Sequence, residues 1–122
     1  MSLLNNIFPY FKELKINMEQ PNLNYIKELS GGDLEFEKSI ISVLKKEFPI
    51  EYSLFNENFE NKNYTEAANN VHKIKHKISI LGFKKGLELT STFEKDLKKQ
   101  DIKLYPDFVK ILNKIHVYLK VE

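Results

Sequence analysis

The spacing of apolar residues along the chain is the feature that most limits its fold. In several long stretches apolar residues recur every three or four positions, which is the period of one face of an α-helix. Only four Gly and four Pro interrupt 122 residues, so the breaks between these stretches are few and short. Short connections make neighbouring amphipathic helices pack antiparallel. The pattern therefore predicts an all-α protein built as an up-and-down four-helix bundle.

The ends of the expected helices are marked by residues that stop or start a helix. A short helix over residues 23–29 stops before Gly31, and Asp33 can cap a second helix that runs to residue 59. Within that second helix, Pro49 predicts either a kink or a fresh helix start. Three more helices are expected over residues 64–81, over residues 83–99 and after Pro106.

Length and composition indicate one domain with one hydrophobic core. A chain of 122 residues buries roughly two-thirds of its unfolded surface, and 42% hydrophobic with 30% charged residues is ordinary for a globular protein. We expect residues 1–20 to be an N-terminal arm, because Pro9 interrupts their helical pattern. Residues 21–122 are expected to form the bundle domain, with one or more short N-terminal helices packed across it.

The composition also argues against several classes of function. The absence of cysteine excludes disulfides, thiolate catalysis and Cys-based metal sites. No apolar run approaches the ~18 residues of a membrane span, and the N-terminal residues lack the features of a signal peptide, so we expect a cytoplasmic protein with no membrane partner. All 19 basic residues are lysine, against 17 acidic residues, which disfavours sequence-specific reading of nucleic acid.

The helix expected over residues 64–81 carries the residues of most chemical interest. On a helical wheel its apolar residues form one compact stripe that predicts the buried face: Ala67, Val71, Ile74, Ile78 and Leu81. The opposite strip is expected to face solvent and comprises Ala68, His72, Lys75, His76 and Ser79. His72 is then an exposed histidine rather than a core residue. Periodicity alone leaves a chance surface histidine as the alternative.

The stretch VHKIKHKISILGF, residues 71–83, resembles the signature of histidine-containing phosphotransfer (HPt) domains. In that signature the acceptor histidine is followed by an aliphatic residue, a lysine, usually a glycine, a second aliphatic residue and a second glycine. The matching residues are His72, Ile74, Lys75, Leu81 and Gly82. His76 stands where the family commonly has the first glycine. Residues 23–33 and 63–68 are similar to the domain opening and to the entry of the acceptor helix, so the resemblance covers about residues 20–120.

The resemblance implies that His72 accepts a phosphoryl group from the aspartyl phosphate of one receiver domain and passes it to another. The implied partners are the receiver domain of a hybrid histidine kinase, a response regulator, or both, and the chain is expected to act as a monomer. Lys75, one turn along the helix, is expected to clamp the phosphoryl oxygens, and His76 neighbours the acceptor and can assist it. The expected receiver-binding residues are Lys73, Ser79, Ile80, Gly82 and Phe83.

Some of these residues also have purely structural interpretations. Gly82 can end the helix, Ser79 can be a neutral exposed residue, and Phe83 can extend the core into the next helix. The chain has no glycine-rich phosphate loop, so we expect no ATP site, no autonomous kinase activity and no cofactor of its own. The Mg²⁺ that phosphoryl transfer to aspartate needs would be bound by the receiver domain.

Three other functions stay open at this point. A zinc site at His72 and His76 has suitable helical spacing, but the surrounding lysines repel a cation. A nucleic-acid-binding module would use the lysine-rich stretch over residues 73–85, although acidic residues elsewhere counter its charge. An HPt-like scaffold that docks receivers without accepting phosphate is the third alternative.

Overall fold

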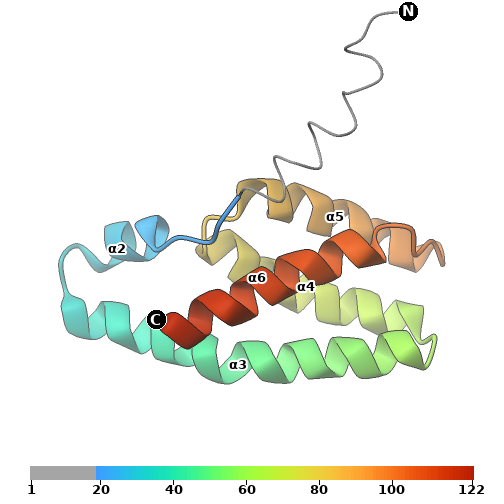
Figure 1. The fold of residues 1–122 in the computed structure, drawn as a ribbon, viewed down its shortest axis with the longest axis horizontal. Helices are drawn as coiled ribbons and strands as arrows, with labels where there is room; N and C mark the ends of the chain where they lie inside the picture. The colour runs from blue at the N-terminus through green and yellow to red at the C-terminus, as the bar shows by residue number, and fades with distance from the viewer. Residues whose placement is uncertain (1–18) are drawn as a thin grey trace, which may run out of the picture.

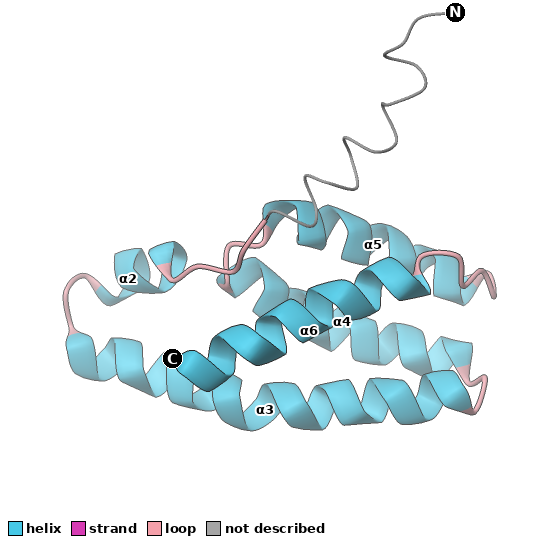
Figure 2. Cartoon of the chain, viewed as in Figure 1, coloured by secondary structure: helices cyan, strands magenta, loops and turns pink. Residues whose placement is uncertain are grey.

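The computed structural model describes residues 19–122, so the prediction of an N-terminal arm falls almost entirely outside the described part. Within that part the chain forms five α-helices and no strand (Figures 1 and 2). The helices are α2 (Asn24–Ser30), α3 (Leu34–Glu60), α4 (Tyr64–Ile80), α5 (Lys84–Lys98) and α6 (Tyr105–Val121). The prediction of an all-α protein is confirmed.

The residues expected to end and start helices do so. Gly31 follows α2 with a left-handed backbone, φ 57°, which glycine adopts at little cost. The carboxylate of Asp33 accepts a hydrogen bond of 3.1 Å from the backbone N–H of Phe36 and so caps α3. Pro49 lies inside α3, which continues through it, so the alternative of a fresh helix start at this proline is wrong.

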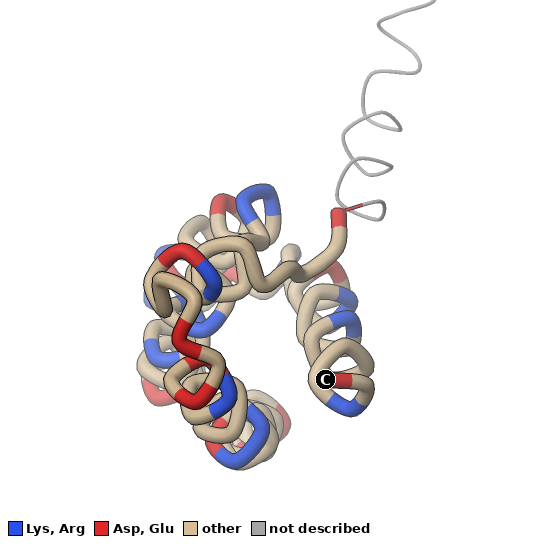
Figure 3. Tube along the Cα trace, turned by 90° about the vertical axis from the view of Figure 1, so that its left-hand side faces the viewer, with Lys and Arg blue, Asp and Glu red and all other residues tan. Residues whose placement is uncertain are grey.

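Helices α3 to α6 surround a common interior. α3 contacts α4 and α6, α5 also contacts α4 and α6, and α2 packs against α3. The end-on view shows the helices arranged around that interior (Figure 3). α3 and α4 run antiparallel: Asn58 bonds to Asn70 near their connection, while Lys77, further along α4, reaches back to Glu47.

Apolar side chains from all five helices fill the interior. Phe55 of α3 is central to it, because its ring contacts Phe93 of α5 and Phe108 of α6 at centroid distances of 6.2 and 5.1 Å. Each large side chain buried in this way stabilises the fold by roughly 1.5–3 kcal/mol. Among residues 19–122, eighteen buried hydrophobic residues make up the core: Ile26, Leu44, Phe48, Phe55, Ala67, Ala68, Val71, Ile74, Ile78, Leu81, Phe83, Phe93, Leu97, Phe108, Ile111, Leu112, Ile115 and Leu119.

The predicted buried face of α4 is confirmed, whereas the prediction that Ala68 is exposed is wrong. All five residues of the apolar stripe are fully buried: Ala67, Val71, Ile74, Ile78 and Leu81. Ala68 is fully buried as well. It lies on the same flank of α4 as Lys75, whose ammonium group contacts α5, and a small side chain on that flank is covered by the neighbouring helix.

A buried lysine fixes α4 against α3. The ammonium group of Lys77, whose side chain is only 11% exposed, lies 2.9 Å from Glu47 and 2.7 Å from Glu51, both on α3. Burial alone would lower the pKa of Lys77, but the two carboxylates outweigh it and leave this pKa raised. The lysine therefore stays charged and paired, and the pairs hold the face of α4 next to it in a defined position.

The residues that precede α2 form hydrogen bonds with the first turn of α5. The carboxylate of Glu19 accepts hydrogen bonds of 2.9 Å from the backbone N–H groups of Lys85 and Gly86, in the first turn of α5. The N–H of Asn22 bonds to the carbonyl of Leu81 at 2.7 Å. These bonds place Asn22 directly against the turn that joins α4 to α5.

We predict that Gly82→Ala destabilises the protein far more than Gly31→Ala. Both glycines have positive φ, 68° and 57°, so each substitution costs roughly 1 kcal/mol of backbone strain. At Gly82 a Cβ would also lie 2.7 Å from the Asn22 amide, whereas Gly31 has open space around it. The expected losses of unfolding free energy are roughly 2–4 and 1 kcal/mol, measured by urea denaturation. Equal losses would contradict the role assigned to Asn22.

Candidate functional site

Two residues of α4 meet one carboxylate of α5. Nδ1 of His72 lies 3.1 Å from Oε2 of Glu94, and Nζ of Lys75 lies 2.9 Å from Oε1 of the same residue. Glu94 is nearly buried, with a side chain 10% exposed, whereas the side chain of His72 is 54% exposed. The nearly buried carboxylate of Glu94 thus contacts and orients the exposed imidazole of His72.

The charge state of Glu94 follows from these neighbours. Burial alone would raise the pKa of Glu94, but the ammonium group of Lys75 and the ring of His72 outweigh burial and leave this pKa below its ordinary value. A second ammonium group, that of Lys98, lies 3.6 Å from Oε2. Glu94 is therefore an ionised carboxylate at neutral pH.

An ionised Glu94 determines which nitrogen of His72 carries the proton. A carboxylate can only accept hydrogen bonds, so Nδ1 of His72 must be the donor across the 3.1 Å contact. In the neutral ring the proton is then on Nδ1, and Nε2 keeps its lone pair. Because the side chain is half exposed, another molecule can reach the ring. The arrangement produces an oriented nitrogen nucleophile.

Lys75 does not stand as a separate clamp beside His72. Its ammonium group is paired with Glu94, and its side chain is 26% exposed. Lys75 and His72 are therefore brought together through a shared carboxylate, a link that the sequence prediction did not contain. With Lys98 also near Glu94, two ammonium groups face one carboxylate, so the local charge is positive.

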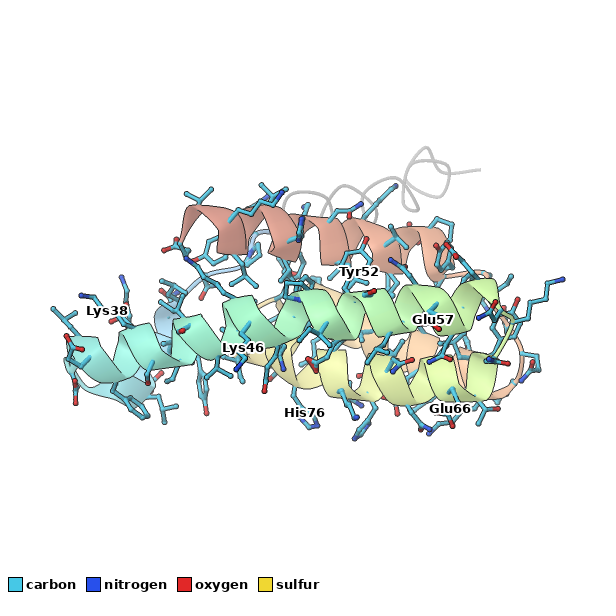
Figure 4. The ribbon with its side chains drawn as sticks, turned by 90° about the horizontal axis from the view of Figure 1, so that it is seen from below. Lys38, Lys46, Tyr52, Glu57, Glu66 and His76 are labelled. Carbon is cyan, nitrogen blue, oxygen red and sulfur yellow. The ribbon has the colours of Figure 1, made fainter. Side chains whose placement is uncertain are left out.

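The remaining predicted residues of α4 lie around this group. His76 is exposed, its ring centroid is 5.3 Å from that of His72, and the two rings are nearly perpendicular at 88°. His76 projects outward from α4 in Figure 4. Lys73 and Ser79 are exposed, and Ile80 is half-buried against the core.

Two residues of the predicted receiver-binding set, Phe83 and Gly82, have structural roles in the fold. Phe83 is fully buried, and its ring packs so closely on Gly86 that a Cβ at that position would clash with it. The core interpretation of Phe83 is therefore correct, and its place in a docking patch is wrong. Gly82 has φ 68° and is approached by the chain's own Asn22. Its conformation is thus required by the turn and by that internal contact.

Glu94 is the site residue that sequence reasoning missed. The signal was present, because Glu94 lies between Thr90 and Leu97 on the buried face of α5, at a position where an apolar residue is expected. A carboxylate on a buried face needs a charged or hydrogen-bonded partner. The spacing does not say which helix supplies that partner, and only the packing of α4 against α5 identifies His72 and Lys75.

Comparison with known proteins adds no relative. No family model matches the chain, and neither the curated proteins nor the solved structures contain a match. Among residues 19–122, no cluster of three or more His, Asp or Glu side chains is placed to hold a metal ion. In the same range, none of the helices combines the length and the apolar character needed to cross a membrane.

We predict that Glu94→Met removes the tautomer preference of His72. In the neutral ring of wild-type His72 the proton should be on Nδ1, because the carboxylate of Glu94 accepts a hydrogen bond from it. Without the carboxylate, His72 should show the mixed tautomers of a solvated histidine in nitrogen-15 NMR of the ring. The matched control is Glu88→Met, an exposed residue of the same helix. A Nδ1–H tautomer retained in Glu94→Met would contradict the assignment.

A pH dependence of stability follows from the pKa of Glu94. This pKa lies below 4.5 in the folded protein, so the ion pairs of Glu94 stabilise the fold above pH 4.5 and are lost as the pH falls through the lowered value. The difference in urea midpoint between wild type and Glu94→Gln should be present at neutral pH and vanish in acid. Glu88→Gln serves as the control. A difference that persists at low pH would show that packing, not charge, accounts for it.

Proposed function

We propose that this protein is a histidine-containing phosphotransfer protein in which His72 accepts a phosphoryl group from a receiver aspartate and passes it to another receiver. The observation that carries the proposal is the contact between Nδ1 of His72 and the ionised Glu94, which leaves Nε2 of an exposed ring as a nucleophile. In this proposal α3 to α6 are the antiparallel up-and-down four-helix bundle of such a domain. The chain acts as a cytoplasmic monomer and a carrier without an ATP site.

The proposed transfer needs one nucleophile from this chain. The lone pair of Nε2 attacks the phosphorus of the receiver's aspartyl phosphate, a nitrogen–phosphorus bond forms, and the bond from phosphorus to the aspartate oxygen breaks. The aspartate leaves as a carboxylate, and Mg²⁺ bound by the receiver offsets the charge of the phosphoryl oxygens. The proton stays on Nδ1, where the carboxylate of Glu94 stabilises the positive charge that the ring gains.

The lysines favour the phosphorylated state. Lys75 and Lys98 neutralise Glu94 and leave a net positive charge beside the acceptor. A phosphoryl group at Nε2 brings negative charge to the same place, and Lys75 has the chain length to move from the carboxylate toward it. The clamp predicted from the sequence is retained in this form: Lys75 rests on Glu94 and turns to the phosphoryl group once it arrives.

Exposed apolar residues on α3 extend the proposed receiver-binding surface. Val43, Ile50 and Leu54 are 51%, 57% and 45% exposed. Val43 and Ile50 lie four residues before and three residues after Glu47, and Leu54 lies three residues after Glu51. These side chains therefore share the side of α3 whose carboxylates pair with Lys77 of α4. Exposed apolar side chains bordered by charges are typical of protein-binding surfaces. Together with Lys73, Ser79 and Ile80 they replace Phe83 in the docking surface.

Incubation with a phosphorylated receiver domain and Mg²⁺ should place one phosphoryl group on His72. The expected adduct is acid-labile and base-stable, and mass spectrometry of peptides locates it. His72→Gln should abolish it, whereas His76→Gln and the control His116→Gln should retain it. An adduct that needs His76 but not His72 would contradict the acceptor assignment. Binding of receivers without any adduct would identify a docking scaffold instead.

Lys75→Ala should slow transfer from the receiver by roughly tenfold while the protein stays folded, because the positive charge nearest the phosphoryl group is removed. The matched control is Lys98→Ala, whose ammonium group lies further from Glu94, 3.6 Å against 2.9 Å. We expect a smaller effect from this control in stopped-flow or quench-flow measurements. Equal rates in wild type and Lys75→Ala would exclude the clamp.

A further inference from the structure

His76 faces His72 at the position where HPt domains commonly have glycine. The ring centroids are 5.3 Å apart in an edge-to-face arrangement, and both side chains are exposed. Glycine has no side chain and would leave this space to a partner. An imidazole one turn from the acceptor instead brings a hydrogen-bond donor that can carry a positive charge.

The charges around His76 indicate which negative group its protonated ring would bind. His72 is the titratable group in ring contact with His76, and Lys73 is exposed on the same helix. Other charged residues on these helices include Glu66 on α4, Lys46 on α3 and Glu88 on α5, which pairs with Lys85. The ion pairs that join this part of α4 to its neighbours bring in three carboxylates, those of Glu47, Glu51 and Glu94, together with Lys75, Lys77 and Lys98. Each of the three carboxylates is already paired with a lysine. A phosphoryl group on Nε2 of His72 would therefore be a new negative charge beside His76.

Lys75 and His76, the two residues predicted to assist His72, differ in whether they are already paired with a carboxylate. Lys75 is held by Glu94 at 2.9 Å. Within residues 19–122, the ring of His76 contacts that of His72 and takes part in no ion pair. An approaching phosphoryl group can thus engage His76 without breaking an ion pair.

We propose that His76, in its protonated form, donates a hydrogen bond to the phosphoryl group on His72, and that this contribution of His76 to the phosphorylated state grows as the pH falls. This inference rests on the proposed function and deepens it, since it adds regulation by pH to the same site. The sign follows from linkage. Phosphorylation favours the protonated form of His76, so protonation of His76 favours phosphorylation, and the gain is lost as the pH rises and the ring becomes neutral.

Chemical phosphorylation tests the contact without a receiver. With phosphoramidate, the lone pair of Nε2 attacks phosphorus, the phosphorus–nitrogen bond of the reagent breaks, and ammonia leaves. The ring signals of His76 are then followed by NMR against pH before and after phosphorylation of His72. The titration midpoint of His76 should rise by roughly half to one pH unit, because a doubly negative group close to the ring favours its protonated form.

The third histidine of the chain is an internal control in the same sample. His116 lies on α6, beside a cavity of about 330 Å³ lined by α3 and α6 residues, and α6 packs mainly on α3 and α5. Its titration midpoint should not move. An unmoved His76 midpoint, or equal movements of His76 and His116, would overturn the proposal.

Variants at position 76 test the consequence for transfer. At equilibrium with a phosphorylated receiver at about pH 6, His76→Gln should lower the ratio of phosphohistidine to phosphoaspartate by roughly threefold, and at about pH 8 it should have little effect. His76→Lys should match or exceed wild type at both pH values, because its charge does not titrate there. His116→Gln should behave as wild type. A His76→Gln effect that is the same at both pH values would contradict a role of the imidazolium.

The two experiments separate this inference from the relay itself. If receivers phosphorylate His72 but the His76 midpoint does not respond, the relay function stands and the proposed contact fails. If no receiver transfers a phosphoryl group but the phosphoramidate adduct moves the His76 midpoint, the contact stands and the relay function fails.

Discussion

The site depends on the contacts that the carboxylate of Glu94 makes with His72 and Lys75. It lies on the buried face of α5, where an unpaired charge would be costly, and its partners come from α4. The same contacts that pair the buried charge orient the ring of His72 and bind the ammonium group of Lys75. Stability and chemistry are therefore coupled at this residue, because the packing of α4 on α5 brings the acid to the imidazole.

Contacts with the neighbouring helices fix the position and the rotation of α4. On one side Lys77 is paired with two carboxylates of α3, and on the other Glu94 is paired with Lys75. The face of α4 between these two sets of pairs is the one that carries His72 and His76. Charged contacts on both flanks and an apolar stripe beneath leave α4 little freedom to rotate.

Much of this arrangement could be predicted from the sequence, because it depends on local rules. Helical period identified the buried stripe of α4 and the exposed position of His72, and Asp33 was recognisable as a cap. The errors arose where a neighbouring helix decides the outcome. Ala68 is covered by such packing, and Phe83 is drawn into the core beside Gly86. The pairing of Glu94 with His72 joins residues 22 positions apart, and no local pattern specifies that distance.

The contact between Asn22 and Gly82 constrains how the sequence can drift. The amide of Asn22 fills the space that any side chain at position 82 would need, while the backbone there has φ 68°. A larger residue at position 82 requires the Asn22 side chain to turn away or to be replaced by a smaller one. The left-handed backbone still restricts the choice at position 82 largely to glycine, asparagine or aspartate. The two positions should therefore change together, if they change at all, in descendants of this chain.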